Sequence, residues 1–245
     1  MSQPSAAVPH TAMILAAGRG TRMRPLSDDR PKPLVPVLGT PILDWTIARL
    51  AAAGVRRVVV NAHVFPEQLE RHAARWTVPE VIVRREREVL ETGGGVVNAL
   101  DLLGGDPFFV VNGDIVWLDG PVPALTRLAE ADRGADAVVL AVPRGEARGY
   151  DGPGDLHLDA EGRVHWREPD TTAPLVFGGV SRLHPRLLRG REPGYGKLAE
   201  ILRDGADVRG VAHDAPFFHI GTPAHRDAAA RELDALGVAG PDGPA

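Results

Sequence analysis

The feature that most constrains the fold is a series of short apolar runs, each followed by a stretch with helical patterning. Apolar runs flanked by helices are typical of buried parallel strands. We therefore expect an α/β fold, a doubly wound, mixed but mainly parallel sheet with right-handed crossovers. The predicted strands are 11–17, 57–62, 81–84, 108–111 and 137–142, and the predicted helices are 41–53, 66–75, 94–103 and 123–131.

After residue 142 the pattern changes. A Gly-rich loop is expected over 145–154, followed by a hairpin of strands 156–158 and 164–167. Further on, strands 175–183 and 208–212, a helix over 197–203 and a closing helix over 223–236 are predicted. This second half is interpreted as a smaller acceptor-binding lobe that leans on the sheet.

Length and composition indicate one soluble globular domain. The 245 residues are 44% hydrophobic and 24% charged, and the net charge of −4 argues against a nucleic-acid partner. There are no cysteines, no signal peptide, and no apolar run near the ~20 residues of a membrane span, so a cytoplasmic protein without a membrane partner is expected. We expect a disordered tail over 1–10, one domain over 11–236 (halves 11–142 and 143–222, then a closing helix), and a tail over 237–245.

The first predicted strand runs directly into a glycine-rich, basic segment. Residues 15–37 read LAAGRGTRMRPLSDDRPKPLVPV, and they contain Gly18 and Gly20 together with the cations Arg19, Arg22, Arg24, Arg30 and Lys32. Glycines allow backbone N–H groups to approach an oxyanion, and the cations neutralise its charge. The segment therefore predicts a polyphosphate site, against the alternative of a basic surface loop.

The two commonest nucleotide-binding motifs are absent. The dinucleotide fingerprint requires a glycine where Met23 stands, and no Gly-Lys-Ser/Thr ending of a P-loop occurs. The segment instead resembles the signature of the sugar-1-phosphate nucleotidylyltransferases, which is G-x-G-x-R followed by P-K-P-L-x-P-V. The residues that match it are Gly18, Gly20, Arg22, Pro31, Lys32, Pro33, Leu34, Pro36 and Val37.

A second motif, Asn112-Gly113-Asp114, follows the predicted strand 108–111. Ligands of open α/β sheets bind beyond the carboxyl ends of the strands, so Asp114 is well placed to hold Mg²⁺ beside the first loop. The alternative is an aspartate that caps a turn. Family members carry a metal-binding aspartate here, so the resemblance implies the same role for Asp114.

The third motif is Glu91-Thr92-Gly93-Gly94-Gly95. Glycines that open a helix expose its first N–H groups to a base or phosphate, although a flexible strand-to-helix turn is equally consistent. The run resembles the E-T-G-G-G of uridylyltransferases that act on N-acetylmuramate 1-phosphate. The nucleotide-binding set expected from the resemblance is Leu15, Ala16, Ala17, Gly18, Arg19, Gly20, Thr21, Asn61, Glu91, Thr92, Gly93, Gly94, Asn112 and Gly113.

The fourth motif, Phe217-Phe218-His219-Ile220-Gly221-Thr222, departs from the family pattern. His219 stands where the family usually has a second metal-binding aspartate. Because Mg²⁺ prefers oxygen ligands, an imidazole would suit Mn²⁺, Co²⁺ or Zn²⁺ better. His219 could ligate the metal, contact a phosphate while Asp114 and the substrates hold Mg²⁺, or mark impaired catalysis. The expected metal site is thus Asp114 with His219, for Mg²⁺ or Mn²⁺.

The acceptor side is less clear. Candidate sugar-phosphate contacts are Asp155, Glu168, Gly178, Gly179 and Lys197. Each has a structural alternative: a capping aspartate, a surface glutamate, a β-bulge for the two glycines, and a lysine on a helix face. No zinc-hydrolase or serine-hydrolase motif is present.

The expected reaction joins a sugar 1-phosphate to UTP and releases pyrophosphate, with N-acetylmuramate 1-phosphate as the favoured sugar, in cell-wall sugar recycling. The catalytic residues expected from the resemblance are Arg22, Lys32 and Asp114. The alternatives are a mannose-1-phosphate guanylyltransferase or another nucleotide-sugar pyrophosphorylase, or a sensor that binds a nucleotide sugar without turnover. The oligomeric state is not readable from the sequence, and a monomer is favoured.

Overall fold

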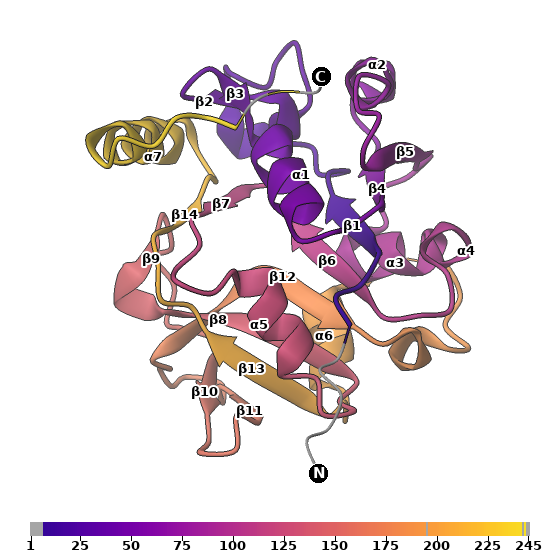
Figure 1. The fold of residues 1–245 in the computed structure, drawn as a ribbon, viewed down its shortest axis with the longest axis vertical. Coiled ribbons are helices and arrows are strands. Elements are labelled where there is room, and N and C mark those ends of the chain that lie inside the picture. Colours follow the sequence, from indigo (N-terminus) through magenta and orange to yellow (C-terminus); the bar gives the residue numbers. More distant parts are fainter. Residues whose placement is uncertain (1–6, 195, 242, 244–245) are drawn as a thin grey trace.

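A large mixed sheet lies at the centre of the molecule (Figure 1). The computed structural model describes residues 7–194, 196–241 and 243, and within these residues the sheet has nine strands. They are β1 (Thr11–Leu15), β4 (Arg57–Ala62), β5 (Glu80–Arg85), β6 (Phe108–Asn112), β8 (Ala137–Pro143), β10 (Leu156–Leu158), β11 (Val164–Trp166), β12 (Leu175–Leu183) and β13 (Val208–Ala212).

The sheet confirms the mixed, mainly parallel architecture. Strands β5, β4, β1 and β6 pair in parallel, as do β13 and β8. Strand β12 pairs antiparallel with both β6 and β8, and the hairpin β10–β11 extends the sheet from the first half of β12. The second half of the chain therefore continues the same sheet.

Alternate residues of each strand point to opposite faces, and each face has its own core. Ala12 and Ile14 of β1 join a cluster with α1 (Ile42–Ala52), α2 (Pro66–Ala73) and α5 (Ala124–Glu130). Met13 joins the cluster on the other face with α3 (Glu91–Asn98), α4 (Leu100–Leu103) and α6 (Leu198–Arg203). Figure 1 shows α1 and α5 over the near face. With both faces covered, the central strands β1, β4, β6 and β8 are buried, mostly apolar runs, as the sequence indicates.

A third core lies beside the carboxyl ends of β1 and β6. It is built on a small sheet of β7 (Ile115–Trp117), β14 (Phe217–His219) and β9 (Ala147–Arg148), with α7 (Pro223–Ala235) packed nearby. The hairpin β2 (Pro36–Val37) and β3 (Thr40–Pro41) contributes Val37 to this core. The short helical turns of the chain are η1 (Thr21–Met23), η2 (Lys32–Leu34), η3 (Arg144–Glu146) and η4 (Pro185–Leu188).

The predicted elements are present, but two stretches differ. The helix expected over 94–103 is two helices, and the first begins at Glu91, so the three glycines lie inside its first turns. The loop expected over 145–154 contains β9, which pairs with β14. The small sheet escapes sequence analysis because its strands are two or three residues long, too short to show alternation.

The predicted terminal tails lie partly outside the described residues, which exclude 1–6, 242, 244 and 245. Nearer the domain, the His10 carbonyl accepts the backbone N–H groups of Arg56 and Arg57. At the other end, the Val238 N–H donates to the Leu233 carbonyl. Within the described part of the chain, no helix combines the length and apolar character needed to span a bilayer.

Candidate active site

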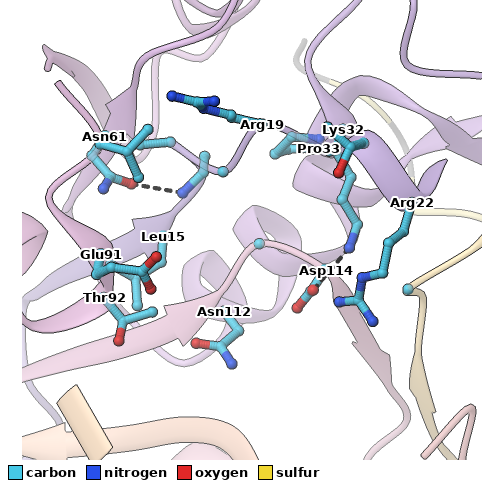
Figure 2. Close-up of a pocket in the computed structure, with 18 residues that line it drawn as sticks. Leu15, Arg19, Arg22, Lys32, Pro33, Asn61, Glu91, Thr92, Asn112 and Asp114 are labelled. Atoms are coloured by element: carbon cyan, nitrogen blue, oxygen red, sulfur yellow. Dashed lines mark hydrogen bonds and ion pairs between the residues drawn. The ribbon is translucent and has the colours of Figure 1, made fainter. Parts of the chain in front are cut away.

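The carboxyl ends of β1, β4 and β6 open into a cavity of about 300 Å³ (Figure 2). Parallel strands end at the same edge of the sheet, which is why loops distant in sequence meet there. The residues that line it are Leu15, Ala16, Ala17, Gly18, Arg19, Gly20, Thr21, Arg22, Lys32, Pro33, Asn61, Val89, Glu91, Thr92, Asn112, Gly113, Asp114 and Gly221. The cavity thus brings together the three predicted catalytic residues and most of the predicted nucleotide-binding residues.

Two glycines allow the loops to approach closely. Gly20 has φ +64°, which favours glycine, and its carbonyl accepts the N–H of Met23 and the hydroxyl of Ser27. The Gly113 N–H donates to the Leu15 carbonyl at 2.9 Å, and a Cβ on Gly113 would lie 2.5 Å from that oxygen. The end of β6 therefore sits directly against the end of β1, which places Asp114 beside the glycine-rich loop.

The five cations of the signature segment separate into two groups. Arg19, Arg22 and Lys32 line the cavity. Figure 2 shows Lys32 and Arg22 extending toward Asp114, with the Arg19 side chain directed away from it. Arg24 and Arg30 instead pair with the neighbouring carboxylates of Asp28 and Asp29. Only three of the five cations are therefore available at the cavity, a distinction that the sequence does not make.

Asp114 lies against a lysine and a histidine. The Lys32 ammonium lies 2.8 Å from Asp114 Oδ2, and His219 Nε2 lies 3.4 Å from the same oxygen. Residues 114 and 219 are joined through the backbone, because the Ile220 N–H donates to the Asp114 carbonyl and His219 pairs with Ile115. His219 Nδ1 contacts the Gly149 carbonyl at 3.0 Å.

These contacts determine the charge of the Asp114 carboxyl group. Burial alone would raise the pKa of Asp114, but the hydrogen bond with His219 and the charge of Lys32 hold that pKa well below its ordinary value. The hydrogen bond to Asp114 raises the pKa of His219, against the opposing effect of burial. Asp114 is therefore an ionised carboxylate at neutral pH.

A chain of buried hydrogen bonds holds the backbone at the start of the glycine-rich loop in place. Asn61, at the end of β4, accepts the Ala16 N–H at 2.6 Å and donates to Glu86 Oε1 at 2.8 Å. Glu86 is only 6% exposed, and burial raises its pKa although the Asn61 hydrogen bond opposes the shift. Sequence analysis missed Glu86 because it lies in the charged run RRERE, which is typical of a solvated surface.

The predicted role of Gly93 and Gly94 in nucleotide binding is not supported. Both backbone N–H groups donate to the Gly196 carbonyl, at 2.8 and 3.0 Å, and neither glycine lines the cavity. A Cβ on Gly93 would collide with the Gly196 carbonyl, and a Cβ on Gly94 would collide with the Gly194 carbonyl. The glycines are thus required by close packing against these carbonyls, while Glu91 and Thr92 face the cavity.

The predicted sugar-phosphate residues do not line this cavity. Asp155 accepts the Phe177 N–H at 2.9 Å, and Glu168 is exposed. Gly178 and Gly179 lie at a β-bulge of β12, where Gly179 packs against the Asn112 side chain. Lys197 precedes α6 and lines a second cavity with Gly93 and Gly94. Gly179 and Lys197 therefore each neighbour predicted nucleotide-binding residues, but the five candidates are not gathered around the first cavity.

Comparisons with known proteins agree with this geometry. The chain matches the nucleotidyl transferase family over residues 11–165. It is 38% identical to the N-acetylmuramate alpha-1-phosphate uridylyltransferase of Caulobacter vibrioides over 92% of this chain and 97% of that relative. The chain belongs to the nucleotidyl transferase family. The predicted sugar-1-phosphate nucleotidylyltransferase, an enzyme, is confirmed at the level of this class.

Other relatives of this nucleotidyl transferase cover less of its length. The N-acetylmuramate alpha-1-phosphate uridylyltransferase of Neisseria meningitidis serogroup B is 36% identical over 86% of this chain and 93% of that relative. The mannose-1-phosphate guanylyltransferase of Mycobacterium tuberculosis is 33% identical over 62% of this chain, which spans only 42% of that relative.

Solved structures show the same fold. HddC from Yersinia pseudotuberculosis, complexed with GMP-PN, superimposes with a TM-score of 0.75 at 23% identity, over 91% of this chain and 99% of that one. A UDP-glucose pyrophosphorylase complexed with UDP-glucose gives a TM-score of 0.78 at 16% identity, over 93% and 99% of the two chains. These likenesses confirm the expected nucleotide-sugar transferase fold.

Three further residues of this nucleotidyl transferase line the cavity but are not among the predicted site residues: Pro33, Val89 and Gly221. Pro33 and Gly221 belong to the signature motifs, so their motif membership was a usable signal. Val89 precedes α3 and has no distinguishing local pattern. Its position at the cavity depends on where α3 begins.

Proposed function

We propose that this enzyme condenses UTP with N-acetylmuramate 1-phosphate, giving the UDP-sugar and pyrophosphate. The cluster of Arg22, Lys32 and Asp114 at the end of a glycine-rich loop is the observation that carries the proposal. The uridylyl and N-acetylmuramate specificities rest on the names of the relatives from C. vibrioides and N. meningitidis, which align over nearly their whole lengths. A cytoplasmic place in cell-wall sugar recycling belongs to the same proposal.

The attacking group needs no general base. A sugar phosphate has a second pKa near ~6, so it is mostly a dianion at neutral pH. One of its oxygens attacks the α-phosphorus of UTP in line. The bond between the α-phosphorus and the oxygen that bridges the α- and β-phosphates breaks, and pyrophosphate leaves with that oxygen. Catalysis then depends on positioning and on charge neutralisation.

The residues of the cavity take distinct roles in this proposal. The backbone of Gly18 to Gly20 cradles the triphosphate, and Arg22 neutralises its β- and γ-phosphates and the departing pyrophosphate. Lys32, whose side chain is only 12% exposed, contacts the reacting phosphates. On the acceptor side, Lys197 is proposed to bind the sugar phosphate, and Asp155, Glu168, Gly178 and Gly179 to lie near the sugar.

A divalent cation, Mg²⁺ or Mn²⁺, completes the proposed site. The Asp114 carboxylate and the His219 imidazole lie 3.4 Å apart beside the cavity, a spacing that lets both contact one ion. Among the described residues, no group of three or more His, Cys, Asp or Glu side chains is arranged to hold a metal. Phosphate oxygens and water would therefore complete the coordination. When bound, the ion supplies positive charge at the α-phosphate.

A substrate panel tests the proposal. The purified enzyme is incubated with each of the four nucleoside triphosphates and with the 1-phosphates of N-acetylmuramate, N-acetylglucosamine, glucose and mannose, and pyrophosphate release is measured. The expected result is release with UTP and N-acetylmuramate 1-phosphate well above every other pair. Preference for GTP with mannose 1-phosphate would support a guanylyltransferase instead, and calorimetric binding of nucleotide sugar without any turnover would support a sensor.

A further inference from the structure

The ring of His219 is oriented by the backbone of a distant loop. Its Nδ1 lies 3.0 Å from the Gly149 carbonyl, and a carbonyl oxygen only accepts hydrogen bonds. Nδ1 therefore carries a proton, and Nε2 is the ring nitrogen that faces Asp114, 3.4 Å from Oδ2. Once Nε2 has given up its own proton, its lone pair is free to bind an ion beside that carboxylate. Metal-binding histidines in proteins are commonly fixed by such a hydrogen bond from the second ring nitrogen.

The position of Gly149 is itself fixed by the small sheet. Strand β9, which ends at Arg148, pairs in parallel with Phe217 and Phe218 of β14. Gly149 has φ +81°, and a Cβ there would collide with the His219 carbonyl. The orientation of the imidazole is thus set by backbone that a side chain at position 149 would displace.

Asp114 and His219 would offer a metal ion two different types of ligand atom. Asp114 offers carboxylate oxygen and His219 offers imidazole nitrogen, and the two side chains are 25% and 27% exposed. Mg²⁺ is bound in proteins almost entirely by oxygen ligands, whereas Mn²⁺ and Co²⁺ bind imidazole nitrogen more tightly than Mg²⁺ does. Because the described residues supply no third ligand of this kind, an ion here would share its coordination with the triphosphate.

We propose that Asp114 and the Gly149-oriented His219 form a mixed oxygen–nitrogen site that selects Mn²⁺ over Mg²⁺ when a nucleoside triphosphate is bound. The inference deepens the proposed function and rests on it, because the triphosphate supplies the remaining ligands. His219 then sets which ion the enzyme uses.

Electron spin-echo spectroscopy of bound Mn²⁺ tests this directly, without turnover. With enzyme in excess over Mn²⁺ and UTP, the wild-type complex should show modulation from a directly coordinated nitrogen, and His219→Asp should abolish it. The matched control is His225→Gln, since the His225 ring lies 6.3 Å from that of His219 and should leave the modulation unchanged. A competition titration measures the Mg²⁺ concentration that displaces half of the bound Mn²⁺. This concentration should be at least about tenfold lower in His219→Asp than in the wild type.

The outcomes separate the two proposals. Bound Mn²⁺ without nitrogen modulation in the wild type, or an unchanged competition ratio in His219→Asp, would overturn the metal selectivity and favour His219 as a phosphate contact. The proposed function would stand in that case. Failure of UTP and of the other three triphosphates to bind in the presence of either ion would overturn the proposed function, and the inference with it.

Discussion

Lys32 is one of only two lysines in this arginine-rich chain, and its ammonium contacts Asp114 inside the cavity. Loss of one charge contact to a transferring phosphate typically costs about 2–4 kcal/mol of transition-state stabilisation. We therefore expect Lys32→Ala and Asp114→Ala each to lower kcat at least about a hundredfold. Pyrophosphate release measures the effect, and circular dichroism checks that the variants are folded.

Arg24 provides the matched control on the same loop. It pairs with Asp28 at the surface, where its side chain is 69% exposed, and it does not line the cavity. Arg24→Ala should retain wild-type turnover. Equal losses in Arg24→Ala and Lys32→Ala would mean that the loop acts through its overall charge, and normal turnover in Lys32→Ala would reject the assigned role.

His213 gives the molecule a specific sensitivity to acid. It is 4% exposed and packs against Phe217, and burial lowers its pKa from the ordinary value of 6.5. The unfolded chain therefore takes up a proton near pH 6.5 that the folded protein resists. The free energy of unfolding should fall as the pH drops from 7.5 to 5.5, and His213→Leu should reduce this fall.

Urea unfolding at both pH values measures the effect. His157→Gln is the matched control, because the His157 side chain is exposed and its substitution should leave the pH dependence as in the wild type. A His213→Leu variant that loses as much stability as the wild type over this range would show that His213 is not the acid-sensitive group.

At the scale of elements, the ends of β1 and β6 are packed too closely for a side chain at position 113. Because a Cβ there would meet the Leu15 carbonyl at 2.5 Å, we expect Gly113→Ala to lower the free energy of unfolding by about 1–3 kcal/mol. Gly105→Ala is the control, since no heavy atom lies within 4 Å of the point that a Cβ at residue 105 would occupy. Equal urea midpoints for the two variants would contradict the expected crowding.

A second element-scale feature joins α3 to the segment before α6. The Leu198 N–H donates to Thr92 Oγ1 at 2.9 Å, next to the two bonds that Gly196 accepts from Gly93 and Gly94. Thr92→Val keeps the shape but removes the acceptor, a loss of about 1 kcal/mol. Hydrogen exchange at the Leu198 amide should accelerate roughly fivefold in Thr92→Val and stay slow in Thr92→Ser. Equal rates in both variants would exclude this bond as the source of protection.

At the scale of the whole molecule, ligand binding should be visible as stability. A ligand that binds only the folded state adds about 2.7 kcal/mol at a concentration one hundred times its Kd. UTP with Mn²⁺ should therefore raise the melting temperature by several degrees, and Lys32→Ala should reduce the rise. Thermal unfolding with and without UTP measures it, and an equal rise with uridine alone would indicate that the phosphates contribute nothing.

Much of this architecture can be predicted from the sequence because its cause is local or periodic. The strands 57–62, 175–183 and 208–212 are found with the predicted bounds. The first of them is a run of buried, mostly apolar residues between clear breaks. The glycine-rich loop and Asp114 are also recognisable, because strand ends and motif spacing place them. The fold class and the nucleotidyl transferase family follow from these local signals.

Only the tertiary structure decided which segments distant in sequence contact one another. Gly93 and Gly94 look free for a ligand in the sequence, yet their N–H groups go to Gly196. Glu86 reads as a surface charge, yet it lies buried against Asn61. The sequence by itself determined the sheet, the loop and the carboxylate, because hydrophobic periodicity and backbone chemistry act over a few residues. Hydrogen-bond pairing across a hundred residues depends on how the elements pack, and the packing aimed His219 at Asp114.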